Sequence, residues 1–195
     1  MNVLLMKLPE MTVDRSRIEE VLRLAVPELG AYTLDVMHAV EAVETYAYLE
    51  LAVDSGRPSL ETVRRLMAGQ LGALFQQASL LKLEATLDVP GASAGQAAPW
   101  HYVVETDVLP DAAEDFNQWY DTEHLPGLAA VPGTVRARRY VAADASPRYH
   151  AAYDLASRET FGSEPWLAVR ATEWSSRVRP NFTNTRRIMF KRADA

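Results

Sequence analysis

The histidine at position 124 stands in a setting that suits proton transfer. It lies near the end of the stretch Phe116–Pro126, FNQWYDTEHLP. An imidazole titrates at about pH 6.5, so a modest change in its surroundings poises it to give or take a proton at neutral pH. On a regular helix Asp121 and Tyr120 share its face. We expect His124 to act as general acid or base and Asp121 to orient it. The alternative is a histidine that only caps the helix before Pro126.

A second group of candidates follows about fifteen residues later, in the run Arg138-Arg139-Tyr140. Side chains alternate across a strand, so Arg138 and Tyr140 share one face and Arg139 lies on the other. A guanidinium and a phenol beside a pocket stabilise a developing oxyanion or enolate. We therefore predict Tyr140 as a catalytic residue, with Arg138 and Arg139 binding substrate. Arginines that are simply exposed on an outer strand are an equal alternative.

Several aromatic side chains could line a cavity for an aromatic ligand. Trp119, Tyr120 and Trp166 are the predicted substrate-binding members of this set, and Trp174 is a further candidate. Each tryptophan could equally belong to a plain hydrophobic core. A cavity lined by them would take a small, largely apolar molecule.

Other kinds of chemistry have little support in the sequence. The absence of cysteine excludes disulfides, thiolate metal sites and cysteine nucleophiles. The histidines are scattered, with no two at metal-binding spacing, at positions 38, 101, 124 and 150. There is no dinucleotide-binding, P-loop or hydrolase motif. We expect no metal and no cofactor, although one histidine suffices for a haem.

Charge and hydropathy limit the partners. Lys and Arg number 20 against 26 Asp and Glu, which gives a net charge of −6. The last twenty residues hold a basic stretch, which we interpret as a solvated strand edge and not as a nucleic-acid site: Arg177, Arg179, Arg186, Arg187, Lys191 and Arg192. No run approaches the roughly 18 apolar residues of a membrane helix, and no signal peptide is evident. We expect a cytoplasmic protein that acts on a small molecule.

The elements that must position these residues recur in one order. Apolar alternation and helical periodicity predict strand, helix, strand, strand, helix, strand in the first half, over residues 2–7, 14–29, 32–40, 44–54, 59–78 and 80–89. The second half repeats this order over residues 100–108, 111–130, 134–143, 148–155, 157–178 and 185–191. We expect the last helix to be broken near its start by Gly162 and Pro165.

This repetition predicts two tandem ferredoxin-like βαββαβ repeats, an α+β fold. Residues 1–89 form the first repeat, residues 90–99 (PGASAGQAAP) a linker, and residues 100–195 the second repeat with the candidate pocket. Each sheet keeps one apolar face free of helices, and packing sheet on sheet into an intrachain barrel would bury both. Two independent domains that pair with other chains, or a homodimer through barrel edges, are the alternatives.

The stretch Phe116–Leu155 resembles the dimeric α/β barrel superfamily, specifically its EthD-like members. The resemblance is carried by the aromatic helix that ends in Glu123-His124-Leu-Pro126, by Pro132-Gly133, by the Arg-Tyr strand and by the strand Tyr149–Leu155. The first half has no counterpart of the Glu-His motif. The resemblance implies a barrel with a pocket, in a superfamily of cofactor-free monooxygenases, polyketide cyclases and dehydratases, lactone isomerases, and haem-handling and chlorite-dismutase-like enzymes.

Function is therefore expected to be that of a cofactor-independent enzyme. It would act by acid/base chemistry on a small apolar, aromatic or polyketide-like molecule, as a lyase, dehydratase or isomerase. A cofactor-free monooxygenase is the first alternative. A non-catalytic small-molecule-binding or stress-response protein, or a purely structural pseudo-dimer, is the second.

Overall fold

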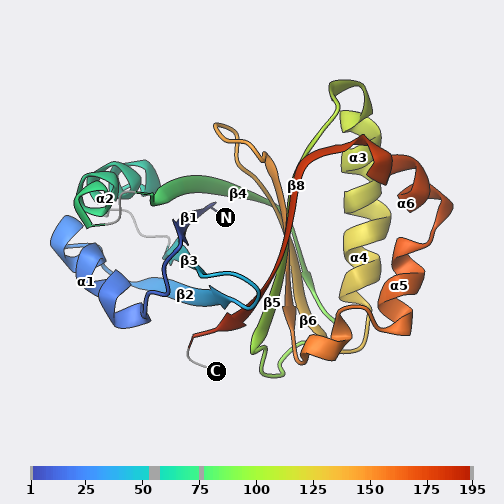
Figure 1. The fold of residues 1–195 in the computed structure, drawn as a ribbon, viewed down its shortest axis with the longest axis horizontal. Helices are drawn as coiled ribbons and strands as arrows, with labels where there is room; N and C mark the ends of the chain where they lie inside the picture. Colours follow the sequence, from blue (N-terminus) through green and yellow to red (C-terminus); the bar gives the residue numbers. More distant parts are fainter. Residues whose placement is uncertain (1, 53–57, 75–76, 194–195) are drawn as a thin grey trace. The chain divides into compact units, whose positions relative to one another are not determined.

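The computed structural model describes residues 2–52, 58–74 and 77–193. Its strands are hydrogen-bonded in the closed order β1-β3-β2-β8-β5-β7-β6-β4. Figure 1 shows the helices and strands that follow one another as strand, helix, strand, strand, helix, strand in each half. The expected α+β fold, two ferredoxin-like repeats that form a barrel, is confirmed.

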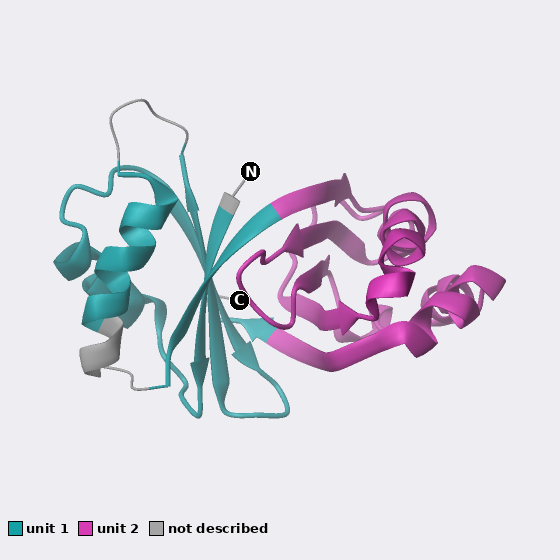
Figure 2. Cartoon of the chain, turned by 90° about the horizontal axis from the view of Figure 1, so that it is seen from above, with its two compact units in different colours: residues 1–84, 191–195 teal, residues 85–190 magenta. Residues whose placement is uncertain are grey.

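The chain divides into two compact units, one made of residues 1–84 with 191–195 and the other of residues 85–190 (Figure 2). Two long strands belong to both units: β4 (Ser79–Pro90) and β8 (Phe182–Arg192). The units therefore differ from the limits 1–89 and 100–195 that the repeat predicts. One end of each of these strands belongs to the first unit and the other end to the second unit.

In the first unit, two helices cover one face of an antiparallel sheet. The strands are β1 (Asn2–Pro9), β2 (Tyr32–Ala39) and β3 (Glu44–Leu51), and the helices are α1 (Arg15–Ala25) and α2 (Leu60–Leu74). The apolar face expected for α1 is buried, because Ile18, Val21 and Leu22 are at most 1% exposed. The expected end of β3 at residues 53–54 lies outside the described residues. The second helix was expected over residues 59–78, but residues 77–78 are not helical, and residues 75–76 lie outside the described residues.

In the second unit, β5 (Trp100–Val108) and β6 (Thr134–Val141) flank β7 (Tyr149–Leu155) in antiparallel register. Alternation along these strands divides the side chains between two faces. Tyr102 of β5 lies opposite Tyr153 of β7, and both belong to the core under the helices. His101 and Asp154 point the other way, also as register partners.

The first helical segment of this unit changes type midway. It comprises α3 (Ala113–Trp119), a π-helical turn (Tyr120–His124) and α4 (Leu125–Ala129), after a 3₁₀ turn (Pro110–Ala112). Within the π turn, the Leu125 amide donates to the Tyr120 carbonyl five residues back. Proline removes an amide and its ring collides with the carbonyl four residues earlier. Pro126 therefore accounts for the widened turn, and a regular helix over residues 111–130 is corrected.

The second helical segment is broken at two caps. Short 3₁₀ turns (Arg158–Thr160 and Arg179–Asn181) flank α5 (Glu164–Arg170) and α6 (Glu173–Val178). The Ser163 hydroxyl accepts the Trp166 amide at the start of α5, and the Thr172 hydroxyl accepts the Ser175 amide at the start of α6. Such caps satisfy amides that have no partner inside the helix. The break near Gly162 and Pro165 was expected, whereas the second start at Thr172 was not.

The connection between β4 and β5 is fixed by hydrogen bonds. The Gly91 amide donates to the Val135 carbonyl at 2.9 Å, and the Ser93 amide donates to the Thr134 carbonyl at 2.9 Å. The Ser93 hydroxyl in turn accepts the Gly133 amide at 2.9 Å. Residues 91–99 thus connect the strands as an ordered turn, although their composition is that of a flexible linker.

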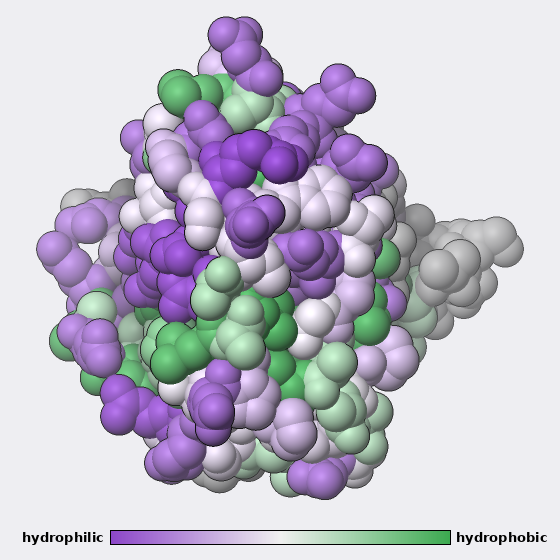
Figure 3. Space-filling model, turned by 90° about the vertical axis from the view of Figure 1, so that its right-hand side faces the viewer, coloured by the Kyte–Doolittle hydropathy of each residue, from purple (hydrophilic) through white to green (hydrophobic). Residues whose placement is uncertain are grey.

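The outward side of the helices in the second unit is mostly polar. Figure 3 shows charged and polar residues over this face, with apolar residues gathered in its lower half. Leu167 of α5 is 51% exposed and Leu109 is 47% exposed. Of the described helices, none has the length and apolar character needed to cross a bilayer.

The turn at Gly133 offers a test of the fold. Its φ is +94°, and a Cβ there would lie 2.1 Å from the Thr160 hydroxyl oxygen. Gly95 has a φ of +88° but open space around a Cβ. We expect Gly95→Ala to cost about 1–2 kcal/mol from backbone strain alone and Gly133→Ala about 3 kcal/mol or more. Urea unfolding of both variants measures the difference; equal losses would show that the contact with Thr160 is unimportant.

Candidate functional site

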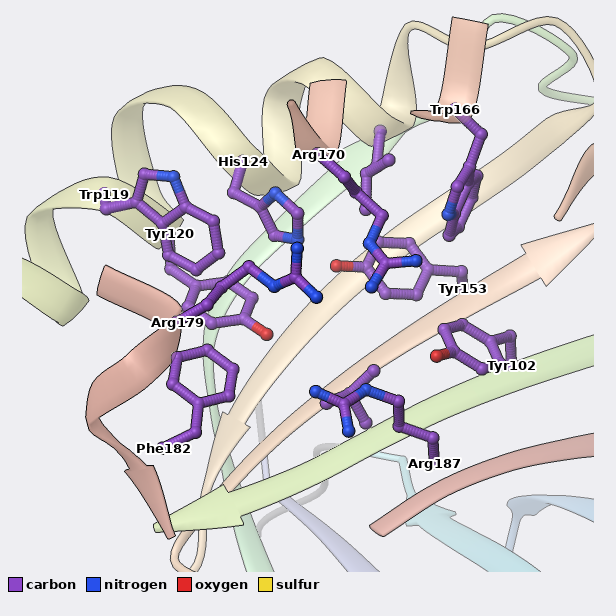
Figure 4. A pocket seen from close by; sticks show the side chains of 12 residues that line it. Tyr102, Trp119, Tyr120, His124, Tyr153, Trp166, Arg170, Arg179, Phe182 and Arg187 are labelled. Atoms are coloured by element: carbon purple, nitrogen blue, oxygen red, sulfur yellow. The ribbon is translucent and has the colours of Figure 1, made fainter. Parts of the chain in front are cut away.

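A pocket lies between the helices and the sheet of the second unit (Figure 4). Helical residues supply Trp119, Tyr120, His124 and Trp166, and strands β5 and β7 supply Tyr102 and Tyr153. The enclosed part holds about 20 Å³, enough for one water molecule, and the space is about 340 Å³ with its open mouth.

His124 is buried among aromatic rings at one wall of the pocket. Its imidazole stacks on the Trp119 ring with centroids 4.1 Å apart and planes 20° apart, and meets the Tyr120 ring edge-on at 5.2 Å. Its Nδ1 atom is buried and has no hydrogen-bond partner among the described residues. The π turn, which contains both Tyr120 and His124, sets the direction of the ring.

Glu123 holds the wall in place from behind. Its Oε1 accepts hydrogen bonds from the Trp119 indole at 3.2 Å and from the Thr172 hydroxyl at 2.7 Å. Thr172 caps α6, so the Glu123 carboxylate links Trp119, on which His124 stacks, to the start of α6. We assigned no role to Glu123 from the sequence. Only the positions of Trp119 and Thr172 reveal it.

The imidazole is neutral over the ordinary pH range. Burial lowers the pKa of His124 to about 3, and the positive charges of Arg170 and Arg179 lower it further in the same direction. A charged imidazole would lose its hydration in this site, and the described lining has no carboxylate that would compensate for the loss. The lowered pKa favours the base over the acid for His124, and its catalytic role stays a prediction.

Two other polar atoms of the pocket wall are buried without a partner in the described part of the chain. These are the Tyr153 hydroxyl and the Trp166 Nε1 atom, on side chains that are each 1% exposed. An indole nitrogen can only donate, and burial raises the pKa of Tyr153 well above its ordinary value, so its hydroxyl keeps its proton. Buried polar groups are usually satisfied, and a bound molecule is one reason for exceptions.

Three arginines complete the lining. Arg170 ends α5, Arg179 follows α6 and Arg187 lies on β8. In Figure 4 their guanidinium groups converge in front of His124 and Tyr153. A Cβ at Gly127 would come within 2.9 Å of the Val169 side chain, so this glycine lets α4 approach α5 and thereby places Arg170. The sequence showed only a basic stretch near the C-terminus, which we interpreted as a solvated edge.

The predicted site residues divide into two groups. Trp119, Tyr120, His124 and Trp166 are brought together around the pocket. Trp174 is not among the lining residues; its indole donates to the Asp115 carboxylate at 2.8 Å. The pocket thus gathers His124 and three of the four predicted aromatic side chains.

Asp121 does not orient His124. Its carboxylate accepts a hydrogen bond from the Arg139 guanidinium at 2.7 Å, and Asn117 accepts a second one at 2.5 Å. The cause is the π turn, because a turn with more residues no longer places positions three apart on one face. Arg139 also lies over the Phe116 ring at 5.1 Å. It fixes the helix to the sheet and does not line the pocket.

Arg138 and Tyr140 lie on the opposite face of β6, away from the pocket. Arg138 donates to the Asp154 carboxylate at 2.7 Å, and the other oxygen of Asp154 meets the His101 ring at 2.8 Å. The Tyr140 hydroxyl is buried without a partner among the described residues. The sequence assigned both residues to the correct common face, but that face is not the one under the helices. Tyr153 takes the place that we expected for Tyr140.

No protein-family model matches this chain, and no curated protein matches it either. Solved structures do share its fold. An anthrone oxidase-like protein is 15% identical with a TM-score of 0.63, and the match covers 98% of this chain and 91% of that one. A ferredoxin-fold protein from Listeria monocytogenes 4b F2365, related to antibiotic biosynthesis monooxygenases, is 9% identical with a TM-score of 0.55 over 98% and 94% of the two chains.

A heme-degrading enzyme from Listeria monocytogenes is also 9% identical, with a TM-score of 0.56 over 98% of this chain and 99% of that one. At these identities the likeness establishes the fold. The chain thus has the ferredoxin-like, dimeric α+β barrel architecture of monooxygenase-fold proteins. Its closer relation to EthD-like proteins stays a prediction.

One protein of this fold degrades haem, so the size of the pocket is compared with that of a haem. The walls Trp119, Tyr120 and Trp166 are held by ring packing, and the enclosed space is about 20 Å³. An enclosed space of this size is far smaller than a tetrapyrrole, so the residues as placed do not fit a haem. No metal-binding group of His, Asp or Glu occurs among the described residues.

Acid should unfold this protein partly through His124. The pKa of His124 is about 3 in the folded chain and about 6.5 in the unfolded chain, so the unfolded chain binds more protons between these values. We expect the wild type to lose about 2 kcal/mol more than His124→Gln between pH 7 and pH 5. Urea unfolding at both pH values measures this difference. Parallel losses would show that His124 is not buried as a neutral ring.

Proposed function

We propose that this protein is an enzyme that removes a proton from a small aromatic molecule, with His124 as the base. The observation that carries the proposal is a buried, neutral imidazole with an unpartnered ring nitrogen at the wall of an aromatic pocket. A general base must be unprotonated and within reach of the substrate. The ring positions of Trp119 and Tyr120 fix the direction in which His124 can accept the proton.

The other residues of the pocket support the charge that this step creates. When His124 takes a proton from an acidic C–H or O–H bond, the electron pair stays on the substrate as an enolate or phenolate. The Tyr153 hydroxyl and the Trp166 indole are donors without partners, and Arg170 and Arg179 carry positive charge. Such preorganised groups stabilise a developing oxyanion. The negative charge also raises the pKa of the imidazole while it holds the proton.

The fate of the anion decides the reaction class. If it is protonated at another atom the enzyme is an isomerase, and if it expels a leaving group the enzyme is a lyase or dehydratase. If the anion passes an electron to O₂ the enzyme is an oxygenase. The likeness to an anthrone oxidase-like protein favours the oxygenase. Proton removal by His124 is common to all of them, and no step needs a bound cofactor.

Deuterium exchange tests the proton transfer without knowledge of the natural substrate. Hydroxylated aromatic ketones with an acidic C–H bond are incubated with the protein in D₂O, and NMR follows loss of the proton signal. We expect catalysed exchange for the wild type and a loss of about 100-fold or more for His124→Gln. His38→Gln is the matched control, because His38 contacts the Val13 carbonyl at 3.0 Å in the first unit.

An oxygen electrode on the same samples separates the reaction classes. Exchange without O₂ uptake indicates an isomerase or lyase, and O₂ consumption that His124→Gln removes indicates an oxygenase. Binding of these compounds without exchange or O₂ uptake would instead indicate a non-catalytic binding protein. Equal exchange rates for wild type and His124→Gln would rule out the proposed base.

A further inference from the structure

We propose that the pocket recognises an aromatic carboxylate: the anionic group lies on Arg170, Arg179 and Arg187, and the ring lies against the tryptophan and tyrosine walls. This inference names the substrate class and rests on the proposed function only for turnover. Binding itself follows from the arrangement of the residues, one property at a time.

The three pocket arginines differ from three other arginines of the same unit that are paired with carboxylates. Arg136 and Arg139 bond the carboxylates of Asp88 and Asp121, and Arg177 bonds that of Asp115. Arg170, Arg179 and Arg187 make no such bond within the described residues, although they come from three separate elements. A guanidinium group presents donors in a fork that matches a carboxylate. Their convergence therefore leaves three such forks available to one ligand.

The charges in the pocket are of one sign. Its described lining contains three arginines and no Asp or Glu. Burial, with the neighbouring charges of Arg170 and Arg187, lowers the pKa of Arg179, which is the expected result of crowding cations without a counter-charge. The chain as a whole carries a net charge of −6, so this concentration of positive charge is local. An anion is the ligand that relieves it.

The walls specify the remainder of the ligand. Among the lining residues, the Trp166 ring packs against Tyr102 and Tyr153, with centroids 6.0 Å and 5.3 Å apart. The Trp166 indole and the Tyr153 hydroxyl are buried donors without partners, so the ring should carry an oxygen that accepts hydrogen bonds. The enclosed space is only about 20 Å³, so a ring can enter the pocket only when lining side chains move.

Entry requires only side-chain movement. Arg187 is exposed, while Arg170 and Arg179 are half-buried. All three are long, flexible side chains at the mouth, whereas the tryptophans behind them are almost fully buried. A carboxylate that draws the guanidinium groups outward would open the enclosed part of the pocket to the ring.

Calorimetry on the full chain tests the inference with 1-hydroxy-2-naphthoate, its neutral carboxamide and inorganic phosphate. We expect the naphthoate to bind, and the carboxamide to bind about tenfold more weakly or worse. Arg179→Gln and Arg187→Gln should each weaken naphthoate binding about tenfold. Arg136→Gln removes the same charge from the exposed pair with Asp88 and should leave binding unchanged. Circular dichroism verifies that each variant is folded.

Three results would overturn the inference. The first is equal affinity for the carboxylate and the carboxamide. The second is phosphate binding as tight as naphthoate binding, since it would leave the aromatic walls without a role. The third is no naphthoate binding, or equal losses for Arg136→Gln and Arg179→Gln. Carboxylate binding that survives His124→Gln, with no proton exchange on any probe, supports this inference and contradicts only the proposed function.

Discussion

The stacking of His124 on Trp119 is the contact on which the pocket depends. It removes the imidazole from water, and burial then lowers the pKa of the ring, with help from the nearby arginines. The stacking requires that Trp119 stays in place, and Glu123 holds Trp119 by accepting a hydrogen bond from its indole. Because Glu123 also bonds Thr172, the position of α6 and the protonation state of His124 are physically connected.

Polar groups are distributed unequally over the two faces of the sheet. On the face away from the helices, His101, Asp154 and Arg138 satisfy one another. On the face under the helices, the Tyr153 hydroxyl, the Trp166 indole and the three arginines have no such partners within the described residues. Paired groups stabilise a fold, whereas unpaired buried groups cost free energy that a ligand can recover. The Tyr140 hydroxyl, on the face away from the helices, is also buried without a partner among the described residues, so it is the three arginines that distinguish the pocket from the polar network on that face.

The fold could be predicted from the sequence because periodicity is a local property. Ile18, Val21 and Leu22 fall on one helical face, and the structure buries them. The site could be predicted only where it is also local, as with Trp119 and His124. The predicted contact of Asp121 with His124 is not formed, because Pro126 changes the helical turn. Tyr140 was predicted to face the pocket and does not, because alternation does not tell which strand face meets the helices. Arg170 and Arg187 are brought together by packing alone, which no local pattern encodes.

The sharing of β4 and β8 has a consequence for how the chain could be divided. In the sheet of residues 85–190, β4 is the outer neighbour of β6 and β8 is the outer neighbour of β5. A fragment that starts at residue 100 would lack β4 and leave the amides and carbonyls of β6 unpaired, an edge to which another copy can add a strand. Chain fragments cut at residues 90–99 would therefore be prone to self-association through this edge.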